Sequence, residues 1–240
     1  MSETVSDPLI RSTGRESSTF GIARWLALPL LAIASSAWGA NTAAYPPTVP
    51  EERTCGTFWL PSGVGPYDYR HPGDTPDIPG GIAANLEGNH LRPETEALRA
   101  PNAGADLDYV LRAVPNHPRA LLAMVRLSQK MKSENLKIGV FTIPCHFIRS
   151  ITFAPDDPTV RFAYGLYLSN FGKKEASLAQ FLKAEELGAD NANNLYNIGL
   201  LYVDLRDYDK GLAYAKRAYA AGFPLPGLRD KLKRAGKWQE

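Results

Sequence analysis

The sequence predicts an all-α protein built from repeated pairs of helices. Residues 158–191 and residues 192–225 are consecutive stretches that match each other, with Gly165 and Gly199 at the same place in each. Both stretches have the apolar periodicity of amphipathic helices. A single helix pair cannot bury its apolar face alone, and further amphipathic stretches do flank these two. Together these observations favour a short array of stacked helix pairs.

The helical segments are predicted in order along the chain. Upstream of the clear repeats, one distorted repeat is expected, because the interval between its helices is longer than in the others and indicates an insertion around Lys132–Gly139. Small residues at matching positions allow the paired helices to approach closely. The predicted segments are residues 105–114, residues 118–131, Ile138–Phe153, the repeats 158–191 and 192–225, and a basic capping helix over Leu228–Trp238.

The second regular repeat carries the fullest pattern of small and aromatic residues. It contains Ile198, Gly199, Tyr202, Tyr208, Gly211, Ala218 and Pro224. This pattern resembles the tetratricopeptide repeat, and the resemblance covers roughly residues 105–238. It implies a short helical-repeat solenoid, with the irregular repeat at about 105–157, whose function resides in a groove lined by the first helix of each repeat.

The same resemblance implies which residues line that groove and what they bind. The expected ligand is a peptide or helical segment of another protein, on a mixed apolar and amide surface that lacks the lysines used to clamp a terminal carboxylate. The alternative is that another helix or the N-terminal arm covers Phe162, Tyr196 and Leu200 as core. The groove positions carried over from the family are Phe162, Leu166, Ser169, Asn170, Asn193, Tyr196, Leu200, Val203 and Asp204.

Residues 1–40 have the organisation of an export signal. A polar region with Arg11, Arg15 and Arg24 precedes an apolar run and then the small residues of a cleavage-like site near Ala37 and Gly39. The other interpretation is an uncleaved membrane anchor over residues 20–40, which is just long enough to cross a bilayer. Either way the rest of the chain is expected outside the cytosol, most simply in a bacterial periplasm.

Export changes how the two cysteines are interpreted. Cys55 and Cys145 are the only two in the chain, and an even number in an oxidising compartment favours a single disulfide. That bond would join the N-terminal segment to the irregular repeat. The alternative is a pair of unbonded thiols packed as small hydrophobic side chains.

Residues 41–100 are predicted to form an irregular arm, because proline and glycine are frequent there and oppose regular helix or sheet. Aromatic residues recur within it. The arm either packs these rings across its own helical domain or presents them as a recognition strand to another protein. The rings concerned are Phe58, Trp59, Tyr67 and Tyr69.

Catalytic chemistry is not indicated. The four histidines, at positions 71, 90, 117 and 146, show no metal-ligand spacing, and no phosphate-binding loop or nucleophile elbow is present. We therefore expect no enzyme activity, no cofactor and no metal. The net charge of +2 gives no indication of a nucleic-acid partner. Seven basic residues near the C-terminus form either a solvated capping helix or a surface for anionic lipid or an acidic partner.

The sequence thus favours a periplasmic adaptor that binds a partner protein in the repeat groove and assists an envelope or secretion assembly. The alternative is a structural subunit of an envelope complex, anchored in the membrane through residues 20–40.

Overall fold

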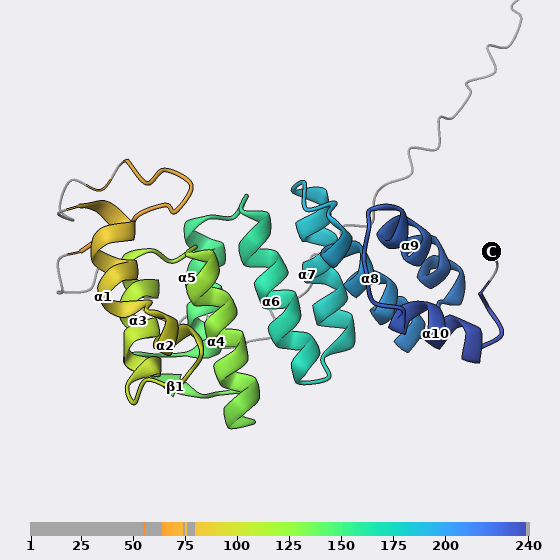
Figure 1. Cartoon of the computed structure of the whole chain (residues 1–240), viewed down its shortest axis with the longest axis horizontal. Helices are drawn as coiled ribbons and strands as arrows, with labels where there is room; N and C mark the ends of the chain where they lie inside the picture. Colours follow the sequence, from red (N-terminus) through yellow and green to blue (C-terminus); the bar gives the residue numbers. More distant parts are fainter. Residues whose placement is uncertain (1–54, 56–63, 74, 76–79, 239–240) are drawn as a thin grey trace, which may run out of the picture. The chain divides into compact units, whose positions relative to one another are not determined.

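The fold is described from a computed structural model (Figure 1), which describes residues 55, 64–73, 75 and 80–238. All of them belong to the unit Pro47–Glu240. The predicted signal or anchor, and the aromatic residues Phe58 and Trp59, lie outside the described residues.

The described part of the chain is mainly helical, in agreement with the all-α prediction. A short two-stranded hairpin is inserted between two of the helices. The elements are the π-helix η2 (Ile82–Glu87), α1 (Gly88–His90), α2 (Pro93–Glu96), α3 (Ala103–Ala113), α4 (Pro118–Met131), β1 (Lys137–Ile138), β2 (Phe141–Thr142), α5 (Ile143–Phe153), α6 (Pro158–Asn170), α7 (Lys174–Glu186), α8 (Ala192–Asp204), α9 (Tyr208–Ala220) and α10 (Gly227–Arg234).

Polar side chains define where the long helices begin. His117, Asp157, Asn191 and Asp207 precede α4, α6, α8 and α9, and each accepts a hydrogen bond from a backbone N–H of the first turn. Such caps satisfy donors that have no partner inside the helix. Pro118 and Pro158 then occupy the first position of α4 and α6, where the missing N–H costs nothing.

Helices adjacent in the sequence pack against one another. The closest pairs are α6 with α7 and α8 with α9, and α7 contacts α8 in turn, while α4 packs against α6 (Figure 1). Helix α10 closes the C-terminal end by placing the buried side chains of Leu228 and Leu232 against α8 and α9. The core therefore passes from one helix pair to the next, as expected for stacked pairs.

Close approach within a pair depends on glycine. A Cβ atom at Gly165 of α6 would lie 2.7 Å from the ring of Phe181 on α7. The equivalent atom at Gly199 of α8 would lie 2.6 Å from Leu228 and 3.4 Å from Tyr214 of α9. These distances confirm the prediction that small residues let the paired helices meet.

Replacing Gly165 with alanine is therefore expected to lower the free energy of unfolding by about 1–2 kcal/mol. Overpacking against the fully buried Phe181 costs about 1–3 kcal/mol, and the higher helix propensity of alanine offsets up to about 1 kcal/mol. The matched control is Gly104→Ala in α3, where the new Cβ meets its nearest neighbour at 3.4 Å. Urea unfolding should show Gly104→Ala as neutral or stabilising, and equal destabilisation by both substitutions would contradict the packing argument.

The helix predicted over Ile138–Phe153 is too long at its N-terminal end. Residues before Ile143 form the antiparallel hairpin of β1 and β2, in which Ile138 pairs with Phe141. Gly139 turns the chain at a φ of +61°, and a Cβ there would lie 2.4 Å from the Asp108 carboxylate. A periodicity argument misses this hairpin because the contact that orders it comes from α3.

The prediction of an irregular arm over residues 41–100 is wrong for its C-terminal part. Residues 64–73 have no regular structure, but η2, α1 and α2 are helical. Ile82 and Leu86 are buried against Ala113 and Val114 at the end of α3, and this contact stabilises the helical turns. The capping helix is also shorter than predicted, since it ends at Arg234 and is followed by Gly236 with a φ of +65°.

Candidate functional site

The predicted groove residues lie on α6 and α8, and all except Asn193 occupy equivalent positions of the two helices. Their burial divides them into three groups. Ser169, Asn170, Asn193 and Asp204 are exposed. Phe162, Leu166 and Leu200 are half-buried at the edges of the core clusters, with the Phe162 ring 5.6 Å from that of Phe181. Tyr196 and Val203 are buried.

The assignment of Tyr196 and Val203 to an open groove is therefore wrong. The Tyr196 ring stacks on Phe223 with a centroid distance of 3.8 Å, and its hydroxyl accepts a hydrogen bond from the backbone N–H of Leu228 at 3.2 Å. Val203 packs in the same cluster, beside Gly211 of α9. Phe223 and helix α10 cover Tyr196, which is the alternative that the sequence left open for this residue, whereas Phe162 and Leu200 remain half-buried.

Charge on this surface is largely paired within the chain. The carboxylate of Asp204 lies 2.5 Å from Lys231 Nζ of α10, and its backbone carbonyl accepts a hydrogen bond from Lys174. The exposed amides of Asn193 and Asn170 carry no charge. The surface of α6 and α8 therefore combines exposed amide groups with half-buried leucine side chains.

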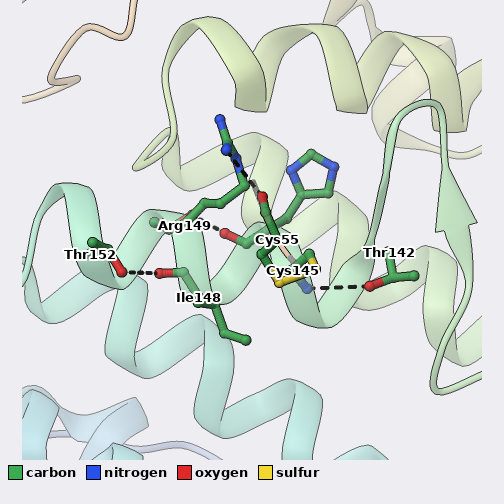
Figure 2. Close-up of a disulfide and its surroundings, with 8 residues drawn as sticks. Cys55, Thr142, Cys145, Ile148, Arg149 and Thr152 are labelled. Atoms are coloured by element: carbon green, nitrogen blue, oxygen red, sulfur yellow. Dashed lines mark hydrogen bonds between the residues drawn. A yellow bond between two sulfur atoms is a disulfide. The ribbon is translucent and has the colours of Figure 1, made fainter. Parts of the chain in front are cut away.

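Cys55 and Cys145 form a disulfide, in agreement with the predicted pairing (Figure 2). Their Cα atoms are 5.1 Å apart, and both residues are buried. Arg149, one turn further along α5, donates a hydrogen bond from Nη1 to the Cys55 carbonyl at 3.3 Å. Disulfides are typical of oxidising compartments outside the cytosol, so this bond indicates an exported chain.

A buried charged cluster that sequence reasoning missed lies beside the disulfide. His146 Nε2 is 3.2 Å from Asp108 Oδ1, and Arg112 Nε donates to the other carboxylate oxygen at 2.9 Å. The same carboxylate accepts a hydrogen bond from the Val140 N–H and so ties the hairpin to α3. Burial lowers the pKa of His146, although the facing carboxylate opposes the shift.

A second buried histidine joins α4 to η2. His117 is fully buried, and its Nε2 lies 3.0 Å from Glu87 Oε1, while Arg119 contacts the other carboxylate oxygen at 2.9 Å. Tyr69 of the arm packs its ring 4.6 Å from the imidazole. Burial lowers the pKa of His117 to about 4 despite the carboxylate. The histidine is therefore neutral at pH 7.

The arm is attached through a polar network at the turns before α4 and α6. Asn116 is buried and donates to Asp68 at 2.7 Å and to Asp157 at 2.9 Å, and its side-chain oxygen accepts from the Tyr69 N–H. Arg70 bridges Asp68 and Asp156. Its guanidinium holds the pKa of the Asp68 carboxyl well below the usual range.

The contacts of residues 64–73 decide whether this part of the arm packs on its own domain or is free to bind another protein. Tyr67 and Tyr69 pack against Ala113 and Val114 in the core of their own domain, and the Tyr67 N–H donates to the Ala113 carbonyl at 2.8 Å. The two rings therefore cover the end of α3 and are not free to serve as a recognition strand.

The two remaining histidines are each close to one carboxylate. His71 and His90 lie beside Asp68 and Asp106 at 3.8 and 3.1 Å. Within the part of the chain that the structure describes, no three His, Cys, Asp or Glu side chains are grouped so as to hold a metal ion. Among those residues, no helix has both the length and the apolar character needed to span a bilayer.

The fold and contacts together define the class of this molecule. It is an all-α protein of successively packed helix pairs in which a disulfide and a polar network attach an N-terminal arm. No known protein-family model matches the sequence, and no curated protein matches it.

Proposed function

We propose that this chain is a periplasmic protein of the tetratricopeptide-repeat type, which binds a segment of another protein on the face formed by α6 and α8. The proposal rests on two pairs of side chains at equivalent positions of those helices: Leu166 and Leu200 are half-buried, and Asn170 and Asp204 are exposed. Recurrent positions of this kind present a repeated surface that suits an extended or helical ligand.

The helical architecture supports the repeat assignment. The pairs α6 with α7 and α8 with α9 have the same order, and in each a glycine of the first helix faces the second helix, Gly165 facing Phe181 and Gly199 facing Tyr214. Helix α10 packs on the second pair as a first helix of a further repeat would. The disulfide supports export, and the signal-like N-terminus favours the periplasm among exported locations.

Burial of Tyr196 and Val203 narrows the binding face. Its exposed part consists of amide, hydroxyl and carboxylate groups, and its apolar part consists of leucine and phenylalanine side chains that are still half-exposed. Such a surface favours a partner segment that offers backbone hydrogen bonds and a few apolar side chains over a highly charged one. The remaining residues are Phe162, Leu166, Ser169, Asn170, Asn193, Leu200 and Asp204.

Photo-crosslinking in cells tests this proposal. A photoreactive phenylalanine analogue is placed separately at Ser169 and at Asn193, both exposed, so that folding is left intact. Irradiation should join the full-length chain to the same protein from both positions, in the periplasmic fraction. The adducts are identified by mass spectrometry.

The matched controls are Glu175 of α7 and Asp209 of α9, which are also exposed, helical and at equivalent positions of their two helices. They lie on the second helix of each pair, so they should give no adduct with that protein. Adducts of equal yield from all four positions, or from the control pair alone, would overturn the assignment of the binding face.

A further inference from the structure

An aromatic and arginine platform lies at the C-terminal end of the helix array. Tyr219 of α9 and Trp238 have ring centroids 6.0 Å apart. The Arg229 guanidinium of α10 lies 4.7 Å from the Tyr219 ring and 5.4 Å from the Trp238 ring. The Tyr219 hydroxyl accepts a hydrogen bond from the Arg229 N–H at 3.0 Å. These three side chains are half-buried, so the platform lies at the surface.

The platform lacks acceptors for two of its polar atoms. Arg229 Nε and Trp238 Nε1 are buried and have no hydrogen-bond partner among the described residues. A buried donor without a hydrogen-bond partner costs free energy. If the half-buried side chains move aside, an anionic oxygen can accept hydrogen bonds from these two donors and remove that cost.

Basic residues are concentrated in the segment of the chain that carries this platform. Between Lys216 and Trp238 the only acidic residue is Asp230, against seven lysines and arginines. Lys231 forms an ion pair with Asp204, and Arg217 forms one with Glu185. The cations that remain exposed are Lys216, Lys233, Arg234 and Lys237.

An exposed apolar side chain adjoins the same end of the array. Leu225 is 59% exposed, in the loop that leads into α10, with Pro224 and Pro226 on either side. The Tyr219 hydroxyl donates to the Leu225 carbonyl at 3.1 Å, which connects this loop to the platform.

We propose that this C-terminal end docks on an anionic lipid surface. Leu225 enters the outer edge of the acyl region, Tyr219 and Trp238 lie at headgroup depth, and the exposed cations contact phosphates. An exposed leucine, amphipathic rings and dispersed lysines suit a bilayer interface. An acidic protein segment would explain the cations but would leave the exposed Leu225 without a role. This inference is independent of the binding face on α6 and α8.

Vesicle sedimentation of the full chain tests the proposal. The probes are vesicles of phosphatidylcholine alone and vesicles with about a third phosphatidylglycerol, so that any contribution of the N-terminal apolar segment appears with both. Charge reversal by Lys233→Glu, Arg234→Glu and Lys237→Glu together should reduce the phosphatidylglycerol-dependent binding by at least about tenfold. Leu225→Ser should also reduce it.

The controls carry the same changes elsewhere on the molecule. The charge control reverses three exposed cations near the end of α4, Arg126→Glu, Lys130→Glu and Lys132→Glu, and so changes the net charge by the same amount. The control for Leu225→Ser is Met131→Ser, because the Met131 side chain is 55% exposed. These variants should bind anionic vesicles as the wild type does. Equal losses in both sets, or no loss in the C-terminal set, would overturn the proposal, as would absence of phosphatidylglycerol-dependent binding.

A position-specific measurement covers the case in which the N-terminal segment alone sediments all of the protein. A photoreactive residue at position 225 should label phosphatidylglycerol, whereas the same residue at position 131 should not. Equal labelling, or labelling of a protein in place of lipid at position 225, would contradict membrane docking.

Discussion

Removal of the Cys55–Cys145 disulfide is expected to lower the free energy of unfolding by roughly 4 to 5 kcal/mol, the largest single effect that the structure implies. The bond closes a loop across a sequence separation of 90 residues, and a crosslink of that span removes much conformational entropy from the unfolded chain. Denaturant unfolding of the wild type with and without a thiol reductant measures the loss directly.

The double variant Cys55→Ala, Cys145→Ala serves as the control, because it should match the reduced wild type and should not respond to reductant. Amide hydrogen exchange should show which segments lose protection when the disulfide is removed. Amides of residues 64–73 and α5 should exchange faster after reduction, while those of α8 and α9, which contact neither cysteine, should change little. A loss below about 1 kcal/mol would mean that the polar network at Asn116 holds the arm without the bond.

Acidification from pH 6.5 towards pH 4 is expected to destabilise the protein by about 3 kcal/mol through His117 alone. The pKa of the buried imidazole is lowered from 6.5 to about 4, and one pKa unit corresponds to about 1.4 kcal/mol. Between these two values the unfolded state binds more protons than the folded state, so stability falls as the pH falls through that window. Burial of His146 acts in the same direction.

Thermal melting across that pH range tests the assignment. His117→Asn keeps a side-chain oxygen that can cap α4 but removes the titrating ring, so this variant should lose less stability between pH 7 and pH 4.5 than the wild type does. Its stability at pH 7 will be lower because the contact with Tyr69 is lost. His71→Asn, at a position whose side chain is 64% exposed, should keep the wild-type dependence on pH. Identical pH dependence in all three proteins would show that His117 does not control acid sensitivity.

The helices were predictable wherever a local pattern repeats. Apolar periodicity placed α4 at its observed bounds, and the matching stretches 158–191 and 192–225 begin where α6 and α8 begin, because periodicity is a local signal within one helix pair. The hairpin before α5 and the turns of η2 were not predictable in this way. Their ordering contacts, Asp108 with Val140 and Leu86 with Val114, join residues that are distant in the sequence.

The candidate binding face was only partly predictable. The repeat identified which positions of α6 and α8 face the same way, but not which of them a later helix covers, and Tyr196 is covered by Phe223 and Leu228. The network around Asn116 left a visible trace, since Pro115–Pro118 and Pro155–Pro158 are matching turns. Nothing local to these turns indicates that Asp68, far before Asn116 in the chain, completes the network.

The sequence by itself therefore determined the helical class, the positions of the paired helices and the existence of a single possible cysteine pair, because short-range periodicity and composition specify each of these. Only the tertiary structure decided which aromatic residues are buried, where the arm is attached and which ionisable groups face one another. Those outcomes depend on contacts between distant parts of the chain, and a pattern along the sequence carries no information on the distance between such parts.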